Sequence, residues 1–330
     1  MDNKMRPEPK SLQEAIIYFA DPDNCVDYLA IRRWPDGRVL CPTCGSDSVK
    51  YNAERRWWQC ASHHSKRQFS IKVGTIMEDS AIPLDKWLAV MWMITNCKNG
   101  ISSYEIERDV KVTQKSAWFM LHRIRLAMQD ETLGSKLGGR SGEVEADETF
   151  IGGKARNMHL NVKTRRRPRP GHNVSDKTIV MGIMERGGNV RTQVIPDRQK
   201  TTLQPIVKEH VHTGSALFTD EMGGYKGLSA EFDHRIIDHA VKYVDGRVHT
   251  NCMENFWALL KRGLSGTYVS VEPFHLFRYL DEQSFRFNNR GNKENKITDA
   301  DRFDMVVRKI VGKRLTFAQL TGKTADATCF

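Results

Sequence analysis

Residues 142–154 read GEVEADETFIGGK, and the interpretation of the second half of the chain depends on this stretch. Polar and apolar residues alternate along it, which is typical of a β-strand. Successive side chains of a strand point to opposite faces, so Glu143, Glu145 and Asp147 share one face. Glu148 falls with the apolar residues or lies past the regular part of the strand. Periodicity alone leaves open which of the three acids on the shared face serves chemistry.

The hydrophobic pattern that follows alternates between strand and helix. Further strands are expected at residues 177–187, 189–197, 216–221 and 234–240, and helices at 201–211 and 254–264. Three strands, a helix, a strand and then further alternation predict an α/β domain.

The N-terminal part of the chain is expected to be helical on both sides of a short Cys-rich segment. Helical periodicity covers residues 11–33 and resumes at Ile82. A helix is expected at 103–110, where Ser102 and Glu105 are spaced as a capping box.

Thr113 can cap a third helix, and this helix and the one before it have the size of a helix-turn-helix. The second helix of the pair would present a basic face to DNA. The residues of that face are Gln114, Lys115, His122, Arg123 and Arg125. The alternative is a plain helical hairpin with a basic face.

The composition favours a polyanionic partner. The formal net charge is +11 and the pI is near 9.3, which indicates nucleic acid. Residues 154–175 contain seven Lys or Arg, among them Arg165, Arg166 and Arg167, and no acid. Such a loop is either a solvated, like-charged segment or a contact to DNA phosphates.

The polar N-terminus and the lack of an 18-residue apolar run predict a cytoplasmic protein with no membrane partner.

A zinc site is predicted in the Cys-rich segment. Cys41 and Cys44 form a C-x2-C pair, and Cys60 is followed by His63 and His64. Two short-spaced pairs can supply the four tetrahedral ligands of zinc, in a closed site that stabilises a small fold. Spacing does not decide between the two histidines, and the alternative is reduced cysteines beside unrelated histidines.

Two further acids occupy positions where α/β proteins build sites. Asp220 ends an apolar strand, and Glu254 lies in the first turn of an amphipathic helix. Asn251 and Glu254 are also spaced as a helix cap and its partner, so the glutamate could serve only as a cap. One acid on a first strand, one after a fourth strand and one on a late helix is the arrangement of RNase H-like nucleotidyl transferases, which hold two Mg²⁺ ions.

Several motifs together carry a resemblance to a known family. They are CPTCG (41–45) with Cys60, QFSIKVGTIMEDSAIPLDKW (68–87), VEADETFIGGK (144–154), FTDEMGGY (218–225), HTNCMENFWALLKRGLSGTY (249–268), FRFNNR (285–290) and GKRLTFAQLTG (312–322). From about residue 12 to 323 the chain resembles the DDE-type insertion-sequence transposases of the ISXO-like group, which carry a zinc ribbon ahead of the catalytic domain.

The resemblance implies an RNase H-like fold in which Asp147, Asp220 and Glu254 bind Mg²⁺ or Mn²⁺. It favours His64 over His63, because related ribbons often read C-x3-H before the QFS segment, although many members have four cysteines there. It also implies binding to double-stranded DNA, both at the terminal inverted repeats and at the target, and a homo-oligomer that brings two ends together. Lys261 in the late helix is a further expected DNA contact.

The expected organisation has four parts. An N-terminal helix and zinc ribbon occupy residues 1–75, and a helix-turn-helix segment 76–135. The catalytic domain covers 140–290, and a helical tail 291–330. Transposition in a bacterial cytoplasm, with association to the nucleoid when DNA is bound, is the expected function. The alternatives are a zinc-containing DNA-binding regulator with an inactive RNase H-like domain, and a structure-specific nuclease of the same fold.

Overall fold

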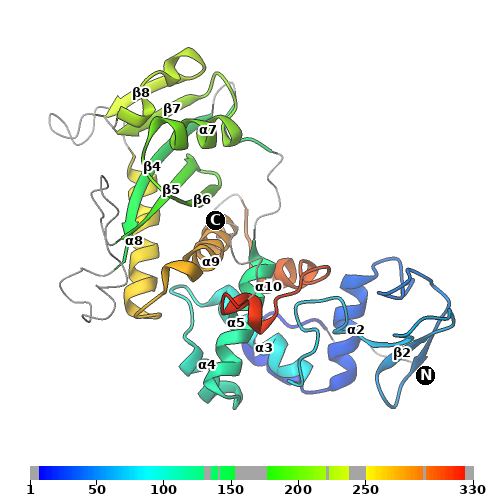
Figure 1. Ribbon diagram of the computed structural model, residues 1–330. Coiled ribbons are helices and arrows are strands. Elements are labelled where there is room, and N and C mark those ends of the chain that lie inside the picture. Colours follow the sequence, from blue (N-terminus) through cyan, green and yellow to red (C-terminus); the bar gives the residue numbers. More distant parts are fainter. Residues whose placement is uncertain are drawn as a thin grey trace. The chain divides into compact units, whose positions relative to one another are not determined.

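The chain separates into two compact units (Figure 1). The computed structural model describes residues 7–129, 135–139, 142–152, 177–220, 223–237, 250–292 and 295–323. One unit combines Met1–Gln129 with Asn289–Phe330, and the other is Asp130–Asn288. The tail expected at 291–330 therefore belongs to the same unit as the N-terminal residues.

The first unit is mostly helical. Its helices are α1 (Leu12–Phe19), α2 (Pro22–Arg33), α3 (Leu84–Asn96), α4 (Ser103–Val110), α5 (Gln114–Met128), α10 (Asp299–Arg308) and α11 (Phe317–Leu320). The expected helical stretch at 11–33 forms two helices, because Asp21 caps a new helix that begins at Pro22. The capping box of Ser102 and Glu105 is confirmed.

A small antiparallel sheet follows α2 in the first unit. Its strands are β1 (Val49–Asn52), β2 (Trp57–Cys60) and β3 (Gln68–Ser70), with β2 in the centre. Trp58 on β2 packs against three aromatic rings, with centroid distances of 4.9 Å to Tyr51, 5.4 Å to Trp34 and 5.8 Å to Phe69. These four aromatic rings supply the apolar core of the sheet, whose strands are only three or four residues long.

Helix α10, close to the C-terminus, completes the core of the first unit. Phe303 is fully buried, and its ring lies 5.0 Å from Trp92, 5.7 Å from Tyr28 and 5.9 Å from Phe19. Aromatic residues bury large apolar areas and dominate the energetics of such cores. Helices α1, α2 and α3 therefore depend on a segment more than 200 residues further along the chain.

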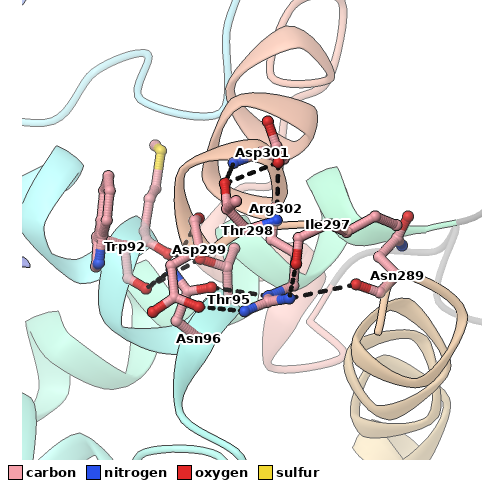
Figure 2. Close-up of polar contacts among 10 residues, drawn as sticks. Trp92, Thr95, Asn96, Asn289, Ile297, Thr298, Asp299, Asp301 and Arg302 are labelled. Atoms are coloured by element: carbon pink, nitrogen blue, oxygen red, sulfur yellow. Dashed lines mark hydrogen bonds and ion pairs between the residues drawn. The ribbon is translucent and has the colours of Figure 1, made fainter. Parts of the chain in front are cut away.

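Polar contacts hold α10 in the same position (Figure 2). Arg302 donates from Nε to the side-chain oxygen of Asn96 over 2.9 Å, and it also contacts the Asp299 carboxylate. The Asn96 amide donates to the carbonyl oxygens of Trp92 (3.0 Å) and Asp299 (3.2 Å). Thr298 and Asp301 form the capping box at the start of α10. The contacts of Arg302 and Asn96 connect α10 to the end of α3.

The second unit is built on a five-stranded mixed sheet (Figure 1). The strands are β4 (Glu143–Ile151), β5 (Thr178–Glu185), β6 (Val190–Ile195), β7 (Ala216–Asp220) and β8 (Asp233–Ile237), in the order β6-β5-β4-β7-β8. β6, β5 and β4 are antiparallel, whereas β4, β7 and β8 are parallel. The expected strands and the mixed α/β character of the chain are confirmed.

Helices cover both faces of this sheet. They are α7 (Lys200–His210), α8 (Asn251–Gly266) and α9 (Leu276–Asn288), with the short 3₁₀ turns η2 (Gly223–Tyr225), η3 (Leu228–Ala230) and η4 (Pro273–His275). Val144 and Ala146 pack with Leu203 of α7 on one face. Val180 and Met184 pack with α8 and α9 on the other. Among the described helices, none combines the length and the apolar character that a membrane crossing requires.

Gly182 lets α8 approach the sheet closely. It lies on β5 directly opposite Asp147 of β4. A Cβ atom at this position would stand 2.6 Å from the Trp257 ring and would also collide with the side chain of Met253. Both residues belong to α8, so the absence of a side chain on β5 fixes the distance between this helix and the sheet.

We expect Gly182→Ala to destabilise the second unit by about 1 to 3 kcal/mol, the usual cost of overpacking a core. Thermal unfolding and amide hydrogen exchange in α8 would measure the effect. Gly266→Ala is the matched control, because Gly266 also lies on α8 and a Cβ there meets nothing within 4 Å. Equal protection of α8 in the two variants would contradict this account of the packing.

Candidate active site and metal centre

Two of the three expected catalytic acids lie on neighbouring parallel strands. The pairing of β4 with β7 runs as far as Glu145 opposite Phe218. Two residues further along each strand, Asp147 and Asp220 reach the same level of the sheet and point to the same face. The register of the two parallel strands therefore places both aspartates at the same level of the sheet.

The third acid comes from the helix that covers this face. Glu254 lies in the first turn of α8, and Asn251 is the first residue of that helix. The residue at the N-cap is Thr250. The alternative in which Asn251 is the cap and Glu254 its partner is therefore wrong.

The three carboxylates influence one another electrostatically. Burial, together with the smaller effect of the negative charges of Asp220 and Glu254, raises the pKa of Asp147 to about 6. Hydrogen bonds to the carboxylate act in the opposite direction. Burial and two neighbouring negative charges therefore both disfavour the ionised form of Asp147.

Both oxygens of Asp147 are held in place. Oδ1 accepts a hydrogen bond from the backbone N–H of Glu148 over 2.8 Å, and Oδ2 accepts one from the indole N–H of Trp257 over 3.0 Å. Trp257 lies three residues after Glu254, on the next turn of α8. The indole thus couples the orientation of Asp147 to the helix that carries Glu254.

Glu145 anchors the start of α8, a role that the sequence did not reveal. Its side chain is 0% exposed. Oε1 accepts from Nε of Arg186 over 2.7 Å, and Oε2 accepts from the backbone N–H of Met253 over 3.0 Å. Met253 is in the first turn of α8, where backbone N–H groups lack partners within the helix and favour a negative charge. Strand alternation placed Glu145 on the same face as Asp147. It could not reveal the partners Arg186 and Met253, because both are distant in sequence.

The zinc ligands expected from the sequence come together in the first unit. The ligand atoms of Cys41, Cys44, Cys60 and His64 all lie within 4.8 Å of one another. Cys41 Sγ is 3.5 Å from His64 Nε2, and Cys44 Sγ is 3.6 Å from Cys60 Sγ. His63 is exposed and is not part of this group. Three thiol groups and one imidazole fit a closed tetrahedral zinc site, with His64 as the fourth ligand.

The residues expected to contact DNA have different surroundings. Lys115 on α5 and Lys261 on α8 are exposed. Lys261 follows Glu254 by seven residues, two helical turns, so the two side chains share one face of α8. The basic triplet Arg165, Arg166 and Arg167 lies outside the described residues.

The prediction that Arg123 and Arg125 lie on an exposed DNA-contacting face is wrong. Their exposed fractions are 5% and 1%. The guanidinium group of Arg123 donates to three backbone carbonyl oxygens, those of Leu315 (3.0 Å), Ile76 (2.9 Å) and Glu78 (2.8 Å). Arg123 therefore links α5 to segments before and after it in the sequence. His122, expected on the same face, is also buried.

The C-terminal segment of the first unit contributes to the burial of Arg123. The ring of Phe317 lies 5.9 Å from that of Phe119 on α5, and Lys313 donates to the carbonyl oxygen of Leu126 over 3.2 Å. Together with the Arg123–Leu315 hydrogen bond, these contacts show that the segment packs along α5.

Comparisons with known proteins match both the zinc-ribbon region and the second unit. Residues 139–288 match the ISXO2-like transposase domain, and residues 20–64 match the transposase zinc-ribbon domain. An uncharacterised transposase-like protein of Haemophilus influenzae is 36% identical over 101 residues, which is 30% of this chain and 81% of that protein. The chain belongs to the ISXO2-like transposase family.

The chain is also similar to a second protein associated with a transposable element. An uncharacterised protein in transposable element ISH50 of Halobacterium salinarum is 26% identical over 257 residues, which cover 75% of this chain and 84% of that protein. No solved structure is significantly similar to the chain.

We expect His64→Ala to lose the bound zinc and His63→Ala to retain about one zinc per chain, because only His64 lies beside the three cysteines. Metal analysis of the purified, dialysed variants would measure the zinc content. His63→Ala is the matched control, because the two histidines are adjacent in the sequence. Equal zinc content in both variants would show that the ligand set is different.

We expect Asp147→Asn to stabilise the protein in the absence of Mg²⁺ at pH 8, by on the order of 2 kcal/mol. The folded-state pKa near 6 exceeds the value of 3.8 for an unperturbed aspartate. The folded protein therefore binds more protons than the unfolded chain between these values, and stability falls as the pH rises through this window. Thermal unfolding at pH 4.5 and pH 8 measures the effect. A stability gain of the same size at both pH values would contradict it.

Proposed function

We propose that this chain is a DDE-type DNA transposase that hydrolyses a phosphodiester bond at the transposon end and joins the freed 3′ end to target DNA. The observation that carries the proposal is the placement of Asp147, Asp220 and Glu254 on one side of the sheet, in a chain of the ISXO2-like transposase family. The two aspartates come from adjacent parallel strands, and the glutamate comes from the helix above them.

The order of the sheet supports an RNase H-like fold for the second unit. In the sheet, β6, β5 and β4 are antiparallel neighbours, and β7 and β8 run parallel to β4. The first strand of this unit in the sequence, β4, lies in the centre of the sheet. The acids of β4 and β7 thus lie in the middle of the sheet, and α8 closes the site from one face.

The donor set fits divalent metal ions. Carboxylate oxygens are the hard ligands that Mg²⁺ and Mn²⁺ prefer. Burial and the charges of Asp220 and Glu254 disfavour ionisation of Asp147, and a bound cation would offset both effects. A pair of such ions, when bound, activates the attacking oxygen and stabilises the leaving oxygen.

The surrounding residues would orient the acids and hold the DNA. Trp257 and the backbone of Glu148 fix the Asp147 carboxylate, so its orientation is set before DNA binds. Lys261 lies on the same face of α8 as Glu254, where an ammonium group can contact a DNA phosphate. Lys115 and the basic segment 154–175 are further proposed phosphate contacts, consistent with the net charge of +11.

Recognition of the two transposon ends is proposed for the first unit. A zinc ribbon and a helix pair of helix-turn-helix size are both suited to DNA binding. Because transposition joins two ends to one target, we propose that the active form is a homo-oligomer on double-stranded DNA.

We expect replacement of Asp147, Asp220 or Glu254 by Ala to reduce Mg²⁺-dependent cleavage about a thousandfold, since metal binding supplies several kcal/mol of transition-state stabilisation. The substrate is double-stranded DNA that carries the inverted repeats flanking the coding region. Glu209→Ala, an exposed acid on α7, is the control and should retain full activity.

The same assay separates the proposed function from its alternatives. Undiminished cleavage by any one of the three variants would remove that residue from the site. Cleavage without joining to target DNA would indicate a nuclease. DNA binding without cleavage by the unmodified protein would indicate a regulator.

A further inference from the structure

We propose that Glu148 and Tyr225 form a positioning pair that sets the separation of Asp147 and Asp220. This inference rests on the proposed function, because it assigns to the pair a role in preparing that metal centre. The pair contacts neither DNA nor metal in this proposal and acts only through the two aspartates.

The backbone pairing leaves the two aspartates without a direct connection. Among the described residues, the ladder between β4 and β7 ends at Glu145 and Phe218, before either aspartate is reached. Asp147 pairs instead with Gly182 on β5, and Asp220 pairs with Ile237 on β8. Each aspartate thus pairs with its outer neighbour, and a contact beyond the end of the β4–β7 ladder can set the distance between them.

The hydrogen bond between Tyr225 and Glu148 spans this gap. The hydroxyl group of Tyr225 donates to Oε1 of Glu148. Glu148 directly follows Asp147, and Tyr225 lies in η2, five residues after Asp220. The bond therefore joins the two chain segments just beyond the end of the ladder.

Glu148 reaches this position from the opposite face of the sheet. It shares the face of Val144 and Ala146, which pack against α7, whereas Asp147 points to the face covered by α8. Tyr225 belongs to the same apolar cluster as these two residues and is 1% exposed. A carboxylate on the α7 side can hold the strand without competing with Asp147 for a metal ion.

The turn that carries Tyr225 is itself firmly held. The amide of Gln204 donates to the carbonyl oxygens of Gly224 (3.2 Å) and Lys226 (2.9 Å). A Cβ on Gly224 would stand 2.7 Å from the Leu203 side chain and 2.9 Å from the carbonyl oxygen of Arg198. Because the turn is anchored to α7 in this way, the hydroxyl group of Tyr225 is a fixed point for Glu148.

Loss of the Tyr225 hydroxyl group would leave the carboxyl group of Glu148 without this hydrogen-bond donor.

The test is Mn²⁺ binding to the zinc-loaded, full-length protein, measured by electron paramagnetic resonance of the free ion. We expect Tyr225→Phe and Glu148→Ala each to weaken binding about tenfold, because a hydrogen bond to a charged group is lost at a buried position. Glu148→Gln keeps an oxygen acceptor for the Tyr225 hydroxyl group and should bind Mn²⁺ within about twofold of the unmodified protein.

Cleavage kinetics supply a second measurement. A positioning role predicts that Tyr225→Phe raises the Mg²⁺ concentration needed for half-maximal cleavage, and that the rate recovers at saturating Mg²⁺. Asp147→Ala, which removes a proposed ligand, should not recover at any Mg²⁺ concentration.

Three results would overturn the proposal. Glu148→Gln could bind as poorly as Glu148→Ala, which would make Glu148 a metal ligand. Tyr225→Phe could bind Mn²⁺ normally, which would make the pair irrelevant to the centre. The unmodified protein could fail to bind Mn²⁺ at all, which would also refute the metal centre. In the first two cases loss of binding and cleavage in Asp147→Ala would leave the proposed function intact.

Discussion

The second unit depends on one buried carboxylate. Glu145 neutralises Arg186 and accepts a hydrogen bond from the first turn of α8, so a strand and a helix 108 residues apart share one charged contact. A buried ion is tolerated only when it is paired and hydrogen-bonded, and removal of one partner leaves an uncompensated charge. The contact holds the first turn of α8 against β4, and this helix also carries Glu254 and Trp257.

Much of the fold was accessible from local patterns. The strands of the second unit were predicted because one of their faces is apolar, and the caps at Ser102 and Thr113 were predicted because they involve residues only three apart. The burial of Arg123 was not predictable in this way. Its acceptors at Ile76 and Leu315 lie 47 and 192 residues away, so the helix seemed to present arginines to solvent.

In the candidate site, too, local sequence patterns could not reveal roles that depend on residues far away along the chain. Strand alternation reduced four acids to three, and only the resemblance to a family singled out Asp147. The roles of Glu145 and Glu148 depend on Met253 and Tyr225, at separations of 108 and 77 residues. Spacing could not decide between His63 and His64 either, whereas the folded ribbon directs one imidazole to the cysteines and the other to solvent.

The aromatic contact of Phe303 also has a consequence for biosynthesis. During translation, Phe19, Tyr28 and Trp92 leave the ribosome long before the ring that packs among them. The first unit can reach its final core only after the whole second unit has been synthesised. A chain cut short by a nonsense mutation in the second unit would therefore lack a completed core in the first unit.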